Sequence, residues 1–186
     1  MTEQQTIKVS NGVDMDVLWK TINAVKDEPS LGKSKFRIHN KWLKAGFNKT
    51  TVSDFYGAGQ ENSHKQTYVL EADEPEILAG EDLAANPVEQ LLHSLAACLT
   101  TSMVYHAATR GIEIEELESH LEGELDIQGF MGLSPDVRKG YQNIRVTFKV
   151  KTESGNIEKL RELAEFSPVL DVVSHGTSVN LRVEPM

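Results

Sequence analysis

The sequence is poor in cysteine, has no long apolar run and shows no excess of positive charge over its 186 residues. The one cysteine, Cys98, has no partner for an intramolecular disulfide, and no Cys-x-x-Cys pair or Cys/His cluster is present for a cysteine-rich zinc site. No apolar run approaches the roughly 18 residues that a membrane span needs. The polar segment from Met1 to Ser10 does not resemble a signal peptide, so we expect a cytoplasmic protein without a membrane partner.

Positive charge is scarce: 19 Lys and Arg residues stand against 28 Asp and Glu residues, which gives a net charge of −9. Phosphate backbones bind basic surfaces, so this balance argues against a nucleic-acid partner. The charge is uneven, because residues 71–89 contain no Lys or Arg and residues 33–49 contain no Asp or Glu. We interpret both segments as solvated faces, and keep open the alternative that they face each other or a partner subunit.

Hydrophobic periodicity and turn signals predict an α+β fold with an antiparallel sheet and segregated helices. A predicted helix over residues 11–28 ends at Pro29, and a short linker follows. Residues 1–34 are therefore predicted to form an N-terminal helical arm on a main domain of residues 35–186. In that domain the predicted strands cover 36–43, 50–56, 65–70, 112–130, 144–150 and 179–183, and the predicted helices cover 87–110, 157–166 and 168–176.

The longest predicted helix carries the strongest local signals. Asn86 suits an N-cap, Pro87 suits the first helical position and Gly111 suits the end. Apolar side chains cover most of its circumference, which is typical of a central helix that is buried on several sides. One small sheet does not cover such a helix, so a second subunit is a source of the missing cover. We also expect Trp19 and Trp42 in the core.

Motifs for phosphoryl or hydride transfer are absent: the sequence has no P-loop, no GxGxxG and no HExxH. The run Gly57-Ala58-Gly59 is not followed by a predicted helix, so it does not indicate a dinucleotide site. His39 and His106 lack acidic residues at metal-ligand spacing. We therefore expect neither a metal nor a cofactor.

Four polar residues are candidates for chemistry. Cys98 is the intrinsically nucleophilic side chain, and it is either an inert core residue or a thiolate that positive charge from elsewhere stabilises. Glu89 and His93 are four residues apart and face each other on a helix. They form a surface ion pair, or Glu89 lines a pocket with Cys98. Ser167 precedes Pro168 as an N-cap would.

The run from Asn86 to Cys98 resembles the signature of the OsmC/Ohr family, and so does Phe166-Ser167-Pro168-Val169, where that family usually has Cys-Pro-Val. The resemblance covers residues 36–183. It implies an intertwined homodimer in which sheets from both chains wrap around long central helices, with sites at the subunit interface. In active members the helix cysteine attacks an organic hydroperoxide and becomes a sulfenic acid, which the second cysteine resolves as a disulfide.

This sequence departs from that family pattern at three positions. Ser167 stands where the resolving cysteine is expected, and its hydroxyl cannot form a disulfide. The family glutamate corresponds to Val88, and Glu89 is rotated from it by about 100° on a helix. The family arginine corresponds to Phe47 after the turn at Ala45-Gly46, and we assign its role to no residue, with Lys44, Lys49 and Arg37 as candidate substitutes.

Three hypotheses follow from the resemblance and the departures. The first is a stress-related OsmC-like protein with a subunit-interface pocket near Cys98 that binds a small apolar or thiol-reactive molecule. The second is a one-cysteine organic hydroperoxide reductase that uses an external thiol. The third is a purely structural or protein-interaction role, in which the 11–28 helix docks a partner. We name Cys98 and Glu89 as candidate catalytic residues, and Ser167 and His93 as candidate binding residues.

Overall fold

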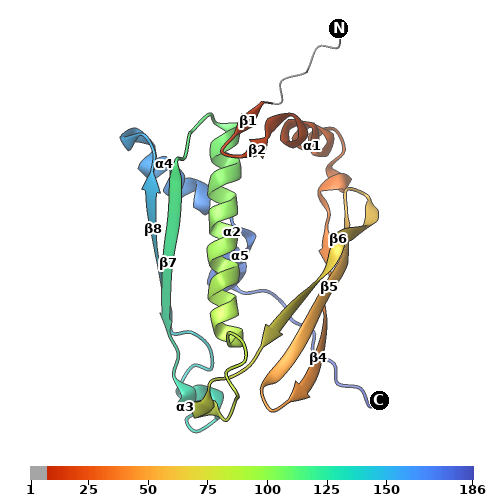
Figure 1. The fold of residues 1–186 in the computed structure, drawn as a ribbon, viewed down its shortest axis with the longest axis vertical. Coiled ribbons are helices and arrows are strands. Elements are labelled where there is room, and N and C mark those ends of the chain that lie inside the picture. The colour runs from red at the N-terminus through yellow and green to blue at the C-terminus, as the bar shows by residue number, and fades with distance from the viewer. Residues whose placement is uncertain (1–7) are drawn as a thin grey trace. The chain divides into compact units, whose positions relative to one another are not determined.

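The structure, a computed structural model, describes residues 8–186, which form two compact units that divide between Leu91 and Leu92 (Figure 1). Both units combine helices with antiparallel strands, which confirms the predicted α+β class. The boundary lies within helix α2 (Pro87–Thr109). The division that the sequence suggested at residue 34 stays a prediction. No helix among the described residues has the length and apolar character to cross a membrane.

The first unit begins with a small hairpin, at residues that were predicted to start a helix. Strands β1 (Val9–Ser10) and β2 (Val13–Asp14) are joined by Asn11 and Gly12, whose φ angles are 50° and 77°. Positive φ at both central residues is the signature of a type I′ turn, which Asn-Gly favours. Helix α1 (Met15–Asp27) starts only afterwards, capped by the Asp14 carboxylate. The predicted helix start at residue 11 was therefore wrong.

An antiparallel meander makes up the sheet of this unit. After a 3₁₀ turn, η1 (Pro29–Gly32), strand β5 (Phe47–Gly57) pairs with β3 (Lys35–Phe36), β4 (His39–Lys44) and β6 (Gln60–Ala72). The predicted strand 36–43 is broken between β3 and β4. The predicted loop around residues 57–63 is a two-residue turn, because Ala58 and Gly59 have φ angles of 51° and 79°. A second 3₁₀ turn, η2 (Glu76–Leu78), lies in the acidic segment.

The second unit contains a two-stranded ribbon and four helices. Strand β7 (Glu116–Glu124) pairs with β8 (Asn143–Lys151), and α3 (Ile127–Phe130) lies between them in the chain. A 3₁₀ turn, η3 (Ser154–Asn156), leads into α4 (Ile157–Ala164), and α5 (Pro168–His175) follows. The predicted strand 112–130 was wrong at its end, where Asp126 caps α3. The predicted strand 179–183 is not formed.

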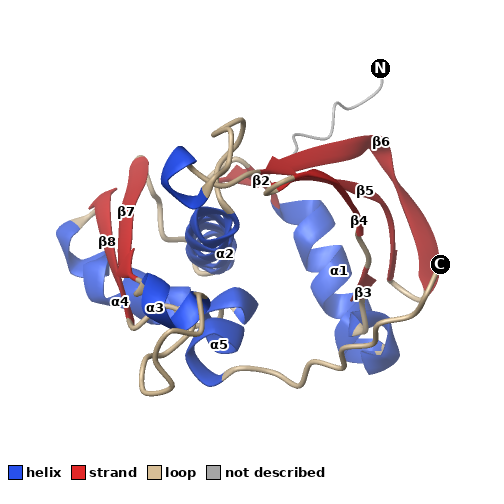
Figure 2. Cartoon of the chain, turned by 90° about the horizontal axis from the view of Figure 1, so that it is seen from below, coloured by secondary structure: helices blue, strands red, loops and turns tan. Residues whose placement is uncertain are grey.

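The core of the second unit joins the C-terminal half of α2 to α4. Met103, Ala107, Ile112, Leu160 and Leu163 form a buried cluster. Alternation along the ribbon turns one face of β7 and β8 toward this cluster, while the opposite face carries charged residues. Figure 2 shows α4 beside the ribbon. This packing fixes the half of α2 that follows Cys98.

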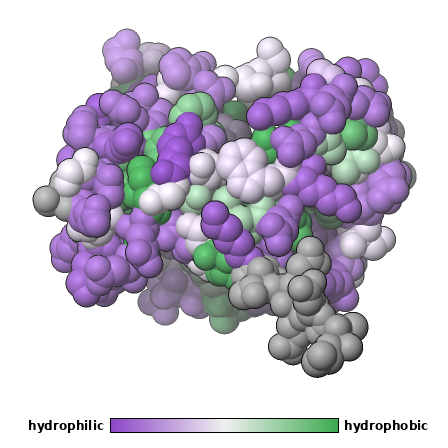
Figure 3. All heavy atoms as spheres, turned by 90° about the horizontal axis from the view of Figure 1, so that it is seen from above, coloured by the Kyte–Doolittle hydropathy of each residue, from purple (hydrophilic) through white to green (hydrophobic). Residues whose placement is uncertain are grey.

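Large apolar side chains also lie at the surface. Trp19 and Trp42 are exposed, so their predicted place in the core was wrong. On the face drawn in Figure 3, apolar residues in green lie between hydrophilic residues in purple. Trp42, Tyr68 and Leu70 share one face of the β4–β6 sheet by register, and all three are exposed. Asn40, Asn48 and Thr50 lie on the same face and are joined by hydrogen bonds, so this face is apolar only in part.

Candidate functional site

Cys98 lies on α2 at the margin of its buried stripe. Leu95 and Leu99 are buried on either side of it, with exposed fractions of 2% and 4%, whereas Cys98 is half-buried. Ser102, one turn later, is buried. The thiol therefore belongs neither to the closed core nor to the open surface.

Hydrogen bonds close both ends of α2, and Gly111 ends the helix as the sequence predicted. At the C-terminal end Ile112 N donates to Ala107 O at 3.0 Å and Gly111 N donates to Ala108 O at 3.3 Å. With Gly111 at φ 66°, these two bonds form a Schellman motif. At the other end the side chain of Gln90 donates to Glu71 O at 2.6 Å and to Ala85 O at 3.0 Å, which fastens the first turn to the end of β6.

Glu89 takes part in the start of this helix. Its backbone N–H donates to Asn86 Oδ1 at 2.8 Å, and its carboxylate accepts from Asn86 N at 2.9 Å. These reciprocal bonds form a capping box, which was not predicted although the spacing Asn-x-x-Glu signals it in the sequence. Glu89 is nine residues, or about 13 Å of helix, before Cys98. Among the ion pairs of residues 8–186 there is none between Glu89 and His93, and His93 is exposed.

The acidic segment before α2 is organised by a buried carboxylate that was not predicted either. Asp73 is 1% exposed and accepts backbone hydrogen bonds from Glu74 at 2.9 Å and from Glu81 and Leu83 at 3.2 Å each. Burial by itself raises the pKa of Asp73, but the three donors and nearby Lys44 outweigh burial and hold that pKa below its ordinary value. An acidic run in a sequence gives no sign of which carboxylate is buried.

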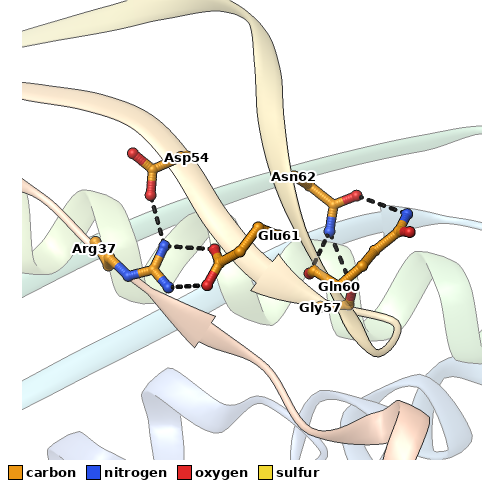
Figure 4. A network of polar contacts seen from close by, with 6 residues as sticks. All are labelled: Arg37, Asp54, Gly57, Gln60, Glu61 and Asn62. Atoms are coloured by element: carbon orange, nitrogen blue, oxygen red, sulfur yellow. Dashed lines mark hydrogen bonds and ion pairs between the residues drawn. The ribbon is translucent and has the colours of Figure 1, made fainter.

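The candidate substitutes for the family arginine all have acidic partners within the first unit. Arg37 binds Glu61 through two hydrogen bonds of 2.7 and 2.8 Å and Asp54 at 2.6 Å (Figure 4), and these carboxylates raise its pKa. Lys49 pairs with Glu71 at 2.6 Å, and Lys44 pairs with Glu81. Two ion pairs therefore join the basic segment 33–49 to the acidic segment 71–89, and all four of these side chains stay exposed to solvent. Phe47, at the family arginine position, begins β5 under the Lys49 ammonium group.

Ser167 is an N-cap, as its place before Pro168 predicted. Its hydroxyl oxygen accepts a hydrogen bond from Leu170 N at 3.1 Å, and the residue is 1% exposed. Gly176 ends α5 with a φ of 77°. The hydroxyl thus has a structural role in α5, and any contact with a ligand would be additional.

His106 and Arg110 connect α2 to the residue before Ser167. The His106 ring stacks on Phe166 with centroids 4.3 Å apart, and Arg110 Nη1 lies 3.1 Å from His106 Nδ1. Burial, and then the charge of Arg110, lower the pKa of His106. Arg110 is twelve residues, or about 18 Å of helix, beyond Cys98, so it does not serve the thiol from its own helix. Within residues 8–186 no cluster of three His, Cys, Asp or Glu side chains suits a metal ion.

Comparison with known proteins gives a consistent family match. The family model described as OsmC-like protein matches residues 80–182, and no curated protein matches the sequence. An OsmC-like protein from Mycoplasma pneumoniae has 17% identity and a TM-score of 0.55 over 76% of this chain and 88% of its own. A putative osmotic stress induced and detoxification response protein from Psychrobacter arcticus has 13% identity and a TM-score of 0.54, over 75% and 88%. The organic hydroperoxide resistance protein OsmC from Legionella pneumophila has 20% identity and a TM-score of 0.50, over 76% and 90%. These structures show a shared fold.

Proposed function

Because this chain belongs to the OsmC-like family, we propose that it is a stress-related homodimer with a small-molecule pocket beside Cys98 at the subunit interface. The ligand is a small apolar or thiol-reactive molecule, and the protein is not a two-cysteine hydroperoxide reductase. One observation carries this proposal: the chain has a single cysteine, and Ser167 occupies the Cys-Pro-Val position. A second sulfur for an intramolecular disulfide is therefore missing.

The surroundings of the candidate residues support ligand binding over peroxide chemistry. A reactive thiolate needs nearby positive charge. Arg37, Lys44 and Lys49 are neutralised by carboxylates of their own unit, and the Glu89 carboxylate accepts a hydrogen bond in the capping box. In this proposal Cys98 contacts the ligand, His93 and Ser167 border the pocket, and Glu89 fixes the start of the helix. A homodimer is supported by the exposed apolar side chains of Trp42, Tyr68 and Leu70, which a second subunit would cover.

The half-buried position of Cys98 favours a second candidate function, a one-cysteine organic hydroperoxide reductase. The Cys98 thiolate would attack the terminal peroxide oxygen, the O–O bond would break, and the alkoxide would leave and take a proton to become the alcohol. An external thiol would then convert the sulfenic acid to a mixed disulfide and water. A second external thiol would release Cys98 and form the external disulfide.

Trapping of the sulfenic acid separates the two candidates. The protein is exposed briefly to cumene hydroperoxide with dimedone and analysed by intact mass, with Cys98→Ser as the control. Labelling no faster than that of a free thiol supports the binding function. Rapid stoichiometric labelling, with thiol-dependent turnover that Cys98→Ser abolishes, would overturn the binding proposal in favour of the reductase.

Ligand binding is tested directly with an apolar fluorescent probe, 1-anilinonaphthalene-8-sulfonate. Cys98→Phe fills the pocket beside the helix, whereas Cys98→Ser keeps the size of the side chain. We expect the first variant to lose probe binding and the second to retain it, with both folded by circular dichroism. Equal probe binding by both variants would place the probe elsewhere and contradict a pocket at Cys98.

A further inference from the structure

Arg110, directly after the last residue of α2, carries a guanidinium group of which one edge is unused. All of its hydrogen-bond contacts are made by Nη1, which lies 3.1 Å from His106 Nδ1, 3.0 Å from His106 O and 3.2 Å from Thr109 Oγ1. Arginine has five N–H donors in a planar fork. The Nε and Nη2 donors therefore have no acceptor among the described residues. They form an edge that binds a carboxylate through two parallel hydrogen bonds.

His106 holds this guanidinium group in place. Because an arginine always donates, Nδ1 of His106 is the acceptor, and the proton of the imidazole ring lies on Nε2. The ring is then neutral, in agreement with its pKa, which burial and the charge of Arg110 lower. A neutral imidazole that accepts from Nη1 orients the guanidinium group and leaves its Nε–Nη2 edge free.

Arg110 has no acidic partner, although the second unit is rich in acidic residues. In residues 92–186 Asp and Glu outnumber Lys and Arg by 14 to 9. The basic residues of β8 each pair with a glutamate, and so does Arg161 in α4. None of the ion pairs within the described part of the chain includes Arg110, which is exposed. Its positive charge is therefore available to an anion from solution.

Phe166 supplies an apolar surface beside the guanidinium group. The His106 ring covers one face of the phenyl ring, with centroids 4.3 Å apart, yet Phe166 is 59% exposed. The exposed area therefore belongs to the other face and the edge of the ring. Arg110 Cζ lies 6.0 Å from the centre of the same ring. One small molecule can thus stack an aromatic body on Phe166 while its carboxylate binds Arg110.

We propose that Arg110 and Phe166 form a binding site for a small aromatic carboxylate. Nε and Nη2 of Arg110 bind the carboxylate, and Phe166 stacks on the aromatic ring of the ligand. One guanidinium edge balances one negative charge, and the surrounding acidic residues disfavour a doubly charged phosphate group. Because Arg110 is about 18 Å of helix from Cys98, this site is separate from the pocket of the proposed function and does not depend on it.

Titration with 2-naphthoate, followed in proton–nitrogen correlation spectra, tests the site. These spectra contain the arginine Nε–H signals, which report directly on each guanidinium group. We expect the Nε–H signal of Arg110 to shift with a Kd of about 1 mM or below. The signal of Arg138, another exposed arginine without an ion pair among the described residues, should stay unchanged. No shift at Arg110, or equal shifts at both arginines, would overturn the proposal.

Matched variants test the contribution of each side chain. Arg110→Gln should weaken 2-naphthoate binding about 10-fold or more, whereas Arg138→Gln should change it less than about twofold. Arg110→Lys keeps the charge at the helix end but loses the two-pronged contact, so it should also weaken binding. Phe166→Leu should weaken binding about threefold or more. Equal Kd values for the two glutamine variants, both folded by circular dichroism, would overturn the role of Arg110.

Ligand analogues test the chemistry of the site. The alcohol 2-naphthylmethanol lacks the charge, and cyclohexanecarboxylate lacks the aromatic ring, so each should bind about threefold more weakly or worse. Equal binding of the alcohol would overturn the carboxylate contact, and equal binding of cyclohexanecarboxylate would overturn the stacking. Tighter binding of 2-naphthyl phosphate would overturn the choice of a monoanion. Cys98→Phe should leave 2-naphthoate binding unchanged, and its loss in that variant would overturn the separation of the two sites.

Discussion

Replacing Ser167 with alanine separates the structural role of this residue from a role in binding. The side chain is 1% exposed, and its oxygen is the acceptor for Leu170 N at 3.1 Å. Loss of a serine N-cap costs about 1 kcal/mol, and leaving a buried N–H without an acceptor costs about 1–3 kcal/mol. Because these two costs describe the same lost bond, we expect a decrease of about 2 kcal/mol in the free energy of unfolding.

The assay is urea unfolding followed by circular dichroism, with Ser174→Ala as the control. Ser174 lies on the same helix and is exposed, so its replacement should change stability by less than about 0.5 kcal/mol. At about 2–4 °C for each kcal/mol in a chain of this size, Ser167→Ala should lower the Tm by about 4–8 °C. Equal stability of the two variants would refute the capping role. If Ser167→Ala keeps probe affinity below its unfolding transition, Ser167 does not contact the ligand.

Four other substitutions test the loop and the start of the helix that precede Cys98, with Gly140→Ala as a control. Asp73→Asn should lower the urea midpoint because a carboxylate that accepts three backbone bonds becomes an amide. Because the pKa of Asp73 is lowered in the folded state, the stabilisation by this carboxylate is present above its ordinary pKa of 3.8 and is lost as the pH falls through the lower folded-state pKa. In urea unfolding at a series of pH values, the wild type and Asp73→Asn should therefore reach equal stability only below that folded-state pKa. Gly80→Ala should cost about 2–3 kcal/mol by calorimetry, because its Cβ would lie 1.7 Å from a backbone carbonyl oxygen, whereas Gly140→Ala, with no atom closer than 3.9 Å, should cost little. Asn86→Ala should lower the free energy of unfolding in urea by about 1 kcal/mol, and Glu89→Gln should lower it by less. A Glu89→Gln variant that keeps full stability but loses hydroperoxide reductase activity would assign Glu89 to the chemistry.

Elements with local signals were predicted well from the sequence. The bounds of α2 follow from Asn86, Pro87 and Gly111, because caps satisfy backbone groups within one helical turn of themselves. The same reason explains the correct start of α5 at Ser167 and Pro168. The Asn11-Gly12 hairpin and the capping box at Glu89 also had local signals, and those errors lay in the interpretation of the sequence.

Other features depend on residues that are far apart in the sequence. Asp73 is buried because donors up to ten residues later fold onto it, and Arg37 meets Glu61 only because β5 brings β6 beside it. An alternating segment becomes a strand only where it pairs with a neighbouring strand, and residues 179–183 alternate without such pairing in the structure.

The sequence by itself determined the family, the helix that carries Cys98 and the absence of a second cysteine. The tertiary structure decided which polar groups already have partners. Glu89 accepts a hydrogen bond at the start of α2, Ser167 accepts one at the start of α5, and the basic residues of the first unit pair with carboxylates of the same unit. Hydrogen bonds and ion pairs between distant segments depend on strand register and burial, and neither can be derived from the local order of residues in the sequence.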